Sequence, residues 1–181
     1  CRDFLHFKTF CSTLEVVAIN ISAVQIYQEN FIDDIAAITR DIGIDTSDIV
    51  LEITESHIMK NTKYSMRILS RLKELGFAIS IDDFGTGHSS MSYLKQFPID
   101  ELKIDKSFVD ELPHDTNDVA IAKAIIVLSQ SLGYVNVAEG IENAEQEQFL
   151  ANNGCQIGQG YHFCVPLGKE KLEQFLRGHC L

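Results

Sequence analysis

The sequence predicts an α/β fold in which a parallel sheet curls into a TIM-like (β/α) barrel. Strand-like and helix-like patterns alternate along all 181 residues, as they do in right-handed βαβ units. The predicted strands are apolar on both faces, so both sides of the sheet should be covered. Each strand also carries a polar residue in it or directly after it. An open doubly wound sheet would instead gather such residues at one switch point, so a barrel is favoured.

Six strands are expected, where a closed barrel has eight. Each is a short run of apolar and β-branched residues that stops at a turn or at a polar side chain. The expected strands cover residues 14–19, 49–54, 77–82, 100–104, 134–138 and 155–159.

The helices between these strands are predicted from apolar residues spaced three and four apart. Ser22 can cap a helix that ends near Gly43, and the next helix stops at Gly76. A short helix ends before Pro98. Further helices are expected at residues 2–12, 117–132, 143–152 and 168–177.

Composition narrows the class of protein. The formal net charge of -11 argues against a surface that binds DNA or RNA. No stretch is apolar enough to span a bilayer, and the N-terminus does not read as a signal peptide. The five cysteines form no CxxC motif, so we expect reduced thiols in the cytoplasm rather than disulfides or a zinc site. A longer parent protein could still be membrane-anchored.

The strongest local signal is the segment Asp82–Gly87, which reads Asp-Asp-Phe-Gly-Thr-Gly at the end of the third strand. Two adjacent carboxylates point in different directions, so one could bridge two cations while the other binds one. An Asx turn at the junction between strand and loop is an equally good interpretation of the pair. The glycines permit backbone angles that other residues resist, so the loop could move.

Two other strands carry charged residues. Glu52 lies within an apolar strand, where a carboxylate is costly unless it is paired or binds a metal. Glu55 follows at the start of the next helix, where a carboxylate is favourable in any case. Lys103 and Asp105 share one face of the fourth strand. They form either a buried ion pair or a lysine that orients or activates water beside metals.

The remaining candidates are Asn20 and three residues near the last two strands. Asn20 closes the first strand, Glu139 follows the fifth, and Glu142 lies in the turn after it, where it could simply start a helix. Gln159, between two glycines, could bind a substrate, a water or neighbouring backbone. The six histidines show no ligand spacing. Carboxylates and an amide without histidine or thiolate suit Mg²⁺, Mn²⁺ or Ca²⁺.

Together these motifs resemble the EAL domain family of bacterial cyclic di-GMP phosphodiesterases. The resemblance covers essentially the whole chain, residues 1–181, as a single domain. The matching segments are Ile19–Ser22, Leu51–Ser56, Asp82–Gly87, Leu102–Asp105, Ala138–Glu142 and Gly158–Tyr161. It implies a TIM-like barrel with two Mg²⁺ or Mn²⁺ ions at its C-terminal rim and Ca²⁺ as an inhibitor. The implied reaction is hydrolysis of cyclic di-GMP to linear pGpG.

The resemblance also implies a role for each residue. The implied metal ligands are Asn20, Glu52, Asp82, Asp83 and Glu139. Asp82 would bridge the two ions, and Lys103 would lie near the attacking water. The implied supporting residues are Asp105, Glu142 and Gln159 around water and substrate, with Glu55 steadying the Asp-Asp loop.

The chain departs from the family pattern at its N-terminal side. Nothing matches the Glu-Ala-Leu stretch, so the first two strands, the named glutamate and a substrate-contacting arginine are expected to be missing. His88 stands where a tyrosine is usual. We therefore expect a weaker first metal site. A gap beside the strands at 14–19 and 155–159 should expose apolar surface.

The resemblance to the family and the missing N-terminal segments together suggest two classes of function. The first is a metal-dependent phosphodiesterase whose N-terminal part lies outside this sequence or is supplied by a partner. The alternative is a catalytically impaired module that binds cyclic di-GMP or a protein partner, or an inactive fragment. Family analogy adds a homodimer through the loop after Asp83, and a sensory or GGDEF domain in a parent protein.

Overall fold

A computed structural model describes residues 1–87 and 91–180 and shows one parallel sheet with the spatial order β1-β2-β3-β4-β5-β6. Its strands are Val17–Asn20 (β1), Ile49–Thr54 (β2), Ala78–Phe84 (β3), Glu101–Ile104 (β4), Val135–Ala138 (β5) and Ile157–Gly158 (β6). Spatial order equals chain order, and helices connect the successive strands, as in a (β/α) barrel. The prediction of an incomplete barrel with six strands is confirmed.

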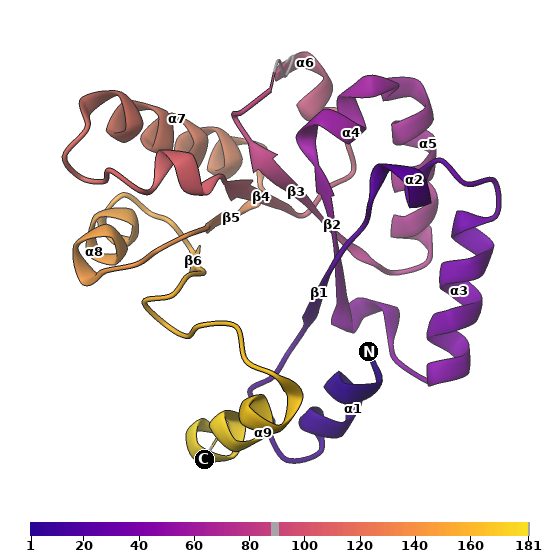
Figure 1. Ribbon diagram of the computed structural model, residues 1–181. Coiled ribbons are helices and arrows are strands. Elements are labelled where there is room, and N and C mark those ends of the chain that lie inside the picture. Colours follow the sequence, from indigo (N-terminus) through magenta and orange to yellow (C-terminus); the bar gives the residue numbers. More distant parts are fainter. Residues whose placement is uncertain (88–90, 181) are drawn as a thin grey trace.

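The helices flank the outer side of a curled sheet (Figure 1). They are Arg2–Lys8 (α1), Ala23–Ile26 (α2), Phe31–Ile42 (α3), Glu55–Lys60 (α4), Thr62–Glu74 (α5), Met91–Leu94 (α6), Thr116–Leu132 (α7), Ala144–Asn152 (α8) and Lys169–His179 (α9). In Figure 1, α3, α4 and α5 lie beside β1–β3, and α7 and α8 lie beside β4–β6. Short 3₁₀ turns at Thr46–Asp48 (η1) and Lys106–Phe108 (η2) precede β2 and follow β4.

Two regions expected as single helices are each divided in two. The helix expected from Ser22 to Gly43 is split into α2 and α3. The helix expected up to Gly76 is split at Asn61, whose side chain accepts a hydrogen bond from the Tyr64 backbone N–H and so caps α5. A side-chain cap satisfies an N–H that a continuous helix would have paired internally.

Alternation along the strands separates an apolar layer from a charged one. Leu51 and Ile53 in β2, like Ile81 in β3, are fully buried in the core on the helix side of the sheet. Glu52 in β2 and Lys103 in β4 project from the opposite, inner face, because side chains in a strand alternate. The curl of the sheet therefore directs these charged groups toward one another.

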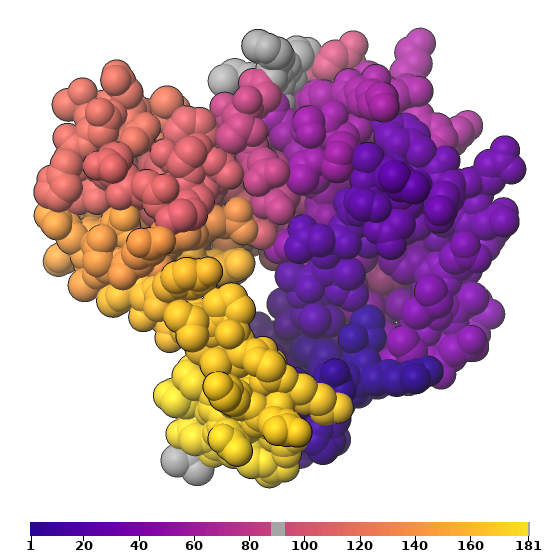
Figure 2. Space-filling view, in the orientation of Figure 1, coloured from indigo at the N-terminus to yellow at the C-terminus, as the bar shows by residue number. Residues whose placement is uncertain are grey.

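The two edges of the sheet, β1 and β6, do not pair with each other, and neither has a second strand partner among the described residues. Apolar side chains are exposed near both edges, including Val16, Ile157 and Phe163. This agrees with the expected gap. Figure 2 shows an opening there, between the indigo N-terminal residues and the yellow C-terminal segment.

The expectation that all cysteines are reduced is wrong for one pair. Cys11 and Cys180 form a disulfide across a sequence separation of 169 residues, whereas Cys1, Cys155 and Cys164 are free. No spacing pattern in the sequence predicts this bond, since its partners come together only when α9 packs against α1. Within residues 1–87 and 91–180, no helix has the length and apolar character needed to cross a bilayer.

Candidate active site

The centre of the site is Lys103, a buried lysine at the end of β4 whose side chain is only 3% exposed. Its Nζ lies 2.7 Å from Glu52 Oε1 on β2 and 2.5 Å from Glu139 Oε1, directly after β5. Asp82 Oδ1 on β3 is 3.5 Å away. Four neighbouring strands thus supply one ammonium and three carboxylates, and the pairing expected for Lys103 involves these residues rather than Asp105.

The charge balance at this centre sets two pKa values. Burial alone would lower the pKa of Lys103, but hydrogen bonds to Glu139 and Glu52 outweigh burial and raise it above its ordinary value. Burial raises the pKa of Glu139, with Lys103 opposing that shift and Asp82 adding to it. Lys103 therefore stays protonated at neutral pH.

A candidate metal cluster lies beside Lys103. Among the described residues, Asp82, Asp83 and Glu139 each offer a carboxylate oxygen, and these oxygens lie within 4.8 Å of one another. Burial raises the pKa of Asp83, and the carboxylates of Asp82 and Asp105 raise it further. Unneutralised carboxylates this close repel one another, and a divalent cation would relieve the repulsion. The donor set fits a hard cation with oxygen ligands.

The backbone at this cluster is held in an uncommon conformation. Asp83 has φ 55°, in the left-handed region, and it is not a glycine. Its N–H donates to Asp82 Oδ1 at 3.0 Å, which ties the Asp82 carboxylate to the backbone of the next residue. Such a conformation persists only where its surroundings enforce it, and it is often found at functional sites.

Glu55 supports the loop that follows. The side chain is buried at the start of α4, and its Oε2 accepts a hydrogen bond from the Gly85 N–H at 2.8 Å. A Cβ at Gly87 would lie 2.5 Å from Glu55 Oε1, so a larger residue there would have to displace this carboxylate. The structure thus brings Glu55 to the loop that it was expected to steady. Among described atoms, Glu55 Oε1 has no hydrogen-bond partner.

The other predicted residues lie around this centre. Asn20 is the register partner of Glu52, and it is exposed at the edge strand β1. Asp105 Oδ1 accepts from the Ser107 N–H at 2.9 Å, so it caps η2 as well as facing Asp83. His88 lies outside the described residues.

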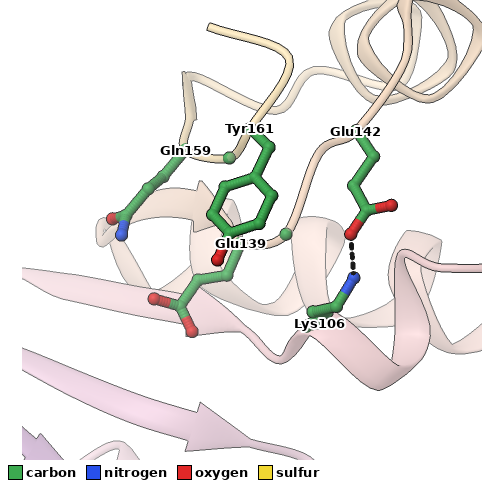
Figure 3. Close-up of a pocket in the computed structure, with 7 residues that line it drawn as sticks. Lys106, Glu139, Glu142, Gln159 and Tyr161 are labelled. Carbon is green, nitrogen blue, oxygen red and sulfur yellow. Dashed lines mark hydrogen bonds and ion pairs between the residues drawn. The ribbon is translucent and has the colours of Figure 1, made fainter. Parts of the chain in front are cut away.

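Gln159 and Glu142 line a separate pocket that Glu139 connects to the metal cluster. This cavity of about 270 Å³ is also lined by Lys106 and Tyr161 (Figure 3). Lys106 Nζ lies 2.7 Å from Glu142 Oε1. No role was predicted for Lys106 or Tyr161 from the sequence, although Tyr161 belongs to a matching segment and Lys106 directly follows another.

Comparisons with known proteins place the chain in a family. The EAL domain family model matches residues 1–166. The chain is 41% identical over 179 residues to the cyclic di-GMP phosphodiesterase NbdA of Pseudomonas aeruginosa, covering 99% of this chain and 23% of that protein. The chain therefore belongs to the EAL domain family, and it spans about a quarter of the length of this relative.

Solved structures agree with this assignment. The EAL domain of Mycobacterium smegmatis DcpA is 34% identical, with a TM-score of 0.93 over 100% of this chain and 81% of that one. The PaMucR phosphodiesterase in complex with c-di-GMP is 37% identical, with a TM-score of 0.84 over 93% of this chain and 72% of that one. The inferred fold and family resemblance are confirmed.

Proposed function

We propose that this chain forms the catalytic part of a metal-dependent phosphodiesterase that hydrolyses cyclic di-GMP to linear pGpG. The observation that carries the proposal is Lys103, held by carboxylates from three other strands next to the cluster of Asp82, Asp83 and Glu139. Structural ion pairs seldom gather so many acidic groups at the ends of parallel strands, where barrels place their active sites. The names of the similar proteins, a cyclic di-GMP phosphodiesterase and a phosphodiesterase–c-di-GMP complex, support this choice of substrate.

The metal site would hold Mg²⁺ or Mn²⁺. Asp82, Asp83 and Glu139 would bind one ion, while Asn20, Glu52 and Asp82 would bind the other, with Asp82 shared. When bound, two such ions lower the pKa of a water and stabilise charge that develops on the phosphoryl oxygens. Without them, the acidic rim would repel an anionic dinucleotide.

The residues of the chain itself would position the attacking water and the substrate and would stabilise negative charge. Because its pKa is raised, Lys103 is a hydrogen-bond donor rather than a base, and it would orient the attacking water or stabilise negative charge. Glu139 and Asp105 would hold that water and the ions in place. Glu55 would fix the Asp-Asp loop through Gly85. Gln159 and Glu142 would contact the substrate from the pocket next to Glu139.

The parent protein would contain more than this chain. We expect the first two barrel strands upstream of β1, and a sensory or GGDEF domain beyond them, since the chain spans 23% of NbdA. The expected location of the catalytic part is the cytoplasm. A homodimer through the loop after Asp83 is expected from family analogy.

Two variants test the proposed reaction. Conversion of cyclic di-GMP to pGpG is measured with Mn²⁺, for this chain and for a version extended upstream through a Glu-Ala-Leu segment. In the extended version, Lys103→Ala and Glu139→Gln should each remove turnover. Lys169→Ala is the matched control and should keep full activity, because its ion pair with Asp3 is exposed and joins α9 to α1. Hydrolysis that survives excess chelator, or full rates in either site variant, would contradict the mechanism.

A binding module is the alternative function. It is favoured by Asn20, which lies exposed on an edge strand, so that among the described residues this half of the proposed metal site lacks a neighbouring strand on one side. Turnover only in the extended version would support the phosphodiesterase. Tight binding of cyclic di-GMP without turnover in both versions would instead support the binding module.

A further inference from the structure

The pocket between η2 and the segments that follow β5 and β6 has the size of a subsite. Its volume of about 270 Å³ is just below the range of roughly 300–1,000 Å³ that is usual for whole small-molecule sites. Glu139 lines it, and Glu139 also belongs to the metal cluster. A dinucleotide with a phosphate at the cluster could therefore place one base, rather than both, in this pocket.

Tyr161 supplies an aromatic surface in the pocket. The residue is 63% exposed, and its hydroxyl and ring have no hydrogen-bond or ring partner in the described part of the chain. In the view of Figure 3 it lies between Gln159 and Glu142, directed toward Glu139. An aromatic ring that is left exposed beside charged groups is a common platform for stacking of a nucleobase.

The polar edge of the pocket is the pair of Lys106 and Glu142. Both side chains are about half exposed, at 47% and 51%. Lys106 donates to Asp110 and to Glu142 Oε1, which leaves one of the three ammonium hydrogens free for a ligand. Among described residues, Glu142 Oε2 has no partner, so it can accept. The two side chains thus present one donor next to carboxylate acceptors.

This arrangement matches guanine and not adenine. The Watson–Crick edge of guanine carries the acceptor O6 beside two donors, N1–H and the exocyclic N2 amine. Lys106 would donate to O6, while the carboxylate of Glu142 would accept from N1–H and N2. Adenine would direct its 6-amino donor at the ammonium group and offers no amine at position 2.

We propose, as a step that rests on the proposed function, that Lys106, Glu142 and Tyr161 form the subsite that selects guanine in the cyclic dinucleotide. Tyr161 stacks on the base, and the ion pair reads its edge. Hydrogen bonds to charged groups give the strongest discrimination of this kind. The site therefore distinguishes cyclic di-GMP from cyclic di-IMP, whose hypoxanthine bases differ from guanine only by the missing N2 amine.

Binding of three ligands to the 181-residue chain tests this assignment. Calorimetric titrations with cyclic di-GMP, cyclic di-IMP and cyclic di-AMP use Ca²⁺ in place of Mn²⁺, so that binding is measured apart from turnover. Loss of one hydrogen bond to a charged acceptor should make the affinity for cyclic di-IMP about tenfold weaker than that for cyclic di-GMP, and cyclic di-AMP should bind more weakly still. Glu142→Gln replaces an acceptor by a donor and should reduce the preference for cyclic di-GMP over cyclic di-IMP to less than about twofold.

The remaining variants separate stacking from edge recognition. Tyr161→Leu should weaken the binding of cyclic di-GMP and of cyclic di-IMP equally, by about tenfold. Tyr161→Phe should bind both ligands like the unaltered chain. Glu145→Gln is the control, since this exposed carboxylate on α8 lies outside the pocket and pairs with His114. Equal affinities for cyclic di-GMP and cyclic di-IMP, or an unchanged preference in Glu142→Gln, would overturn the subsite while leaving the proposed reaction intact. No binding of any cyclic dinucleotide, either to this chain or to the version extended upstream, would overturn both.

Discussion

At the scale of single residues, Lys103 decides the character of the site. A buried ammonium is tolerated only when it is paired, and here Glu52 and Glu139 each accept a close hydrogen bond from it. The ammonium group of Lys103 therefore provides positive charge where several carboxylates converge. It neutralises part of the charge that divalent ions bound there would neutralise, so the proposed metal binding should be linked to the stability of the fold.

This link predicts how loss of Lys103 affects stability. Lys103→Ala leaves buried carboxylates without a partner, so in chelator it should lower the free energy of unfolding by about 3–5 kcal/mol. Mn²⁺ should restore part of the loss, because the ions bind the folded state and take over the neutralisation. Urea unfolding with and without Mn²⁺ measures both effects.

The control for this prediction is Lys169→Ala. Its partner Asp3 is exposed, so the change should cost about 1 kcal/mol or less, with or without metal. If Lys103→Ala lowers the free energy of unfolding by an equally small amount, or by the same amount in chelator and in Mn²⁺, then Lys103 does not neutralise the carboxylates proposed to bind metal.

The sequence indicated which residues meet but not how they pair. Carboxylates at the ends of parallel strands share one rim, so Glu52, Asp82 and Glu139 could be grouped from strand boundaries alone. The partners of Lys103 depend on how strongly the sheet curls, which no local pattern encodes. Tyr161 and Lys106 were missed for a different reason: both are exposed in loops or turns, where hydrophobic periodicity carries no information.

At the scale of elements, the bounds of the central strand β2 were predicted better than the division of the helices and the length of the last strand. Strand β2 has the expected bounds, 49–54, because its apolar run ends sharply. The division at Asn61 lacks glycine or proline and depends on one side-chain cap. Strand β6 is only Ile157–Gly158, shorter than the expected 155–159, since the chain then turns to pack against Ile141.

That turn gives a prediction about Gly160. A Cβ at this position would lie 2.1 Å from Ile141 O and 2.3 Å from Ile141 N, both backbone atoms that cannot rotate away. The same backbone carries the hydrogen bond from the Ile141 N–H to Gln159 O at 3.0 Å. Gly160→Ala should therefore destabilise the fold by roughly 1–3 kcal/mol and distort the Gln159 side of the pocket.

The matched change is Gly178→Ala in α9, where an added Cβ meets nothing within 4 Å. Because alanine favours helices, it should leave stability unchanged or raise it by up to about 1 kcal/mol. Thermal unfolding of the two variants compares them directly. Similar melting temperatures for both would mean that the close approach of Gly160 to Ile141 is not maintained in solution.

At the scale of the whole molecule, the open side of the barrel is crossed by contacts between the two ends of the chain. Helix α9 lies beside α1 (Figure 1), where Lys169 Nζ is 2.5 Å from Asp3 Oδ1. The Arg177 guanidinium lies 3.9 Å from the centre of the Phe10 ring. These contacts are mostly exposed and individually weak. The disulfide between Cys11 and Cys180 is the strong connection between the ends.

A covalent link across 169 residues should stabilise the fold mainly by restricting the unfolded chain. We therefore expect Cys180→Ser, or reduction with dithiothreitol, to lower the free energy of unfolding by roughly 2–5 kcal/mol. Reduction should have no further effect on Cys180→Ser, because the bond is already absent. Cys164→Ser, which changes a free and half-buried thiol, is the control and should respond to reduction as the unaltered chain does. Equal urea midpoints for the oxidised and reduced chain would show that the ends are held by the α1–α9 contacts alone.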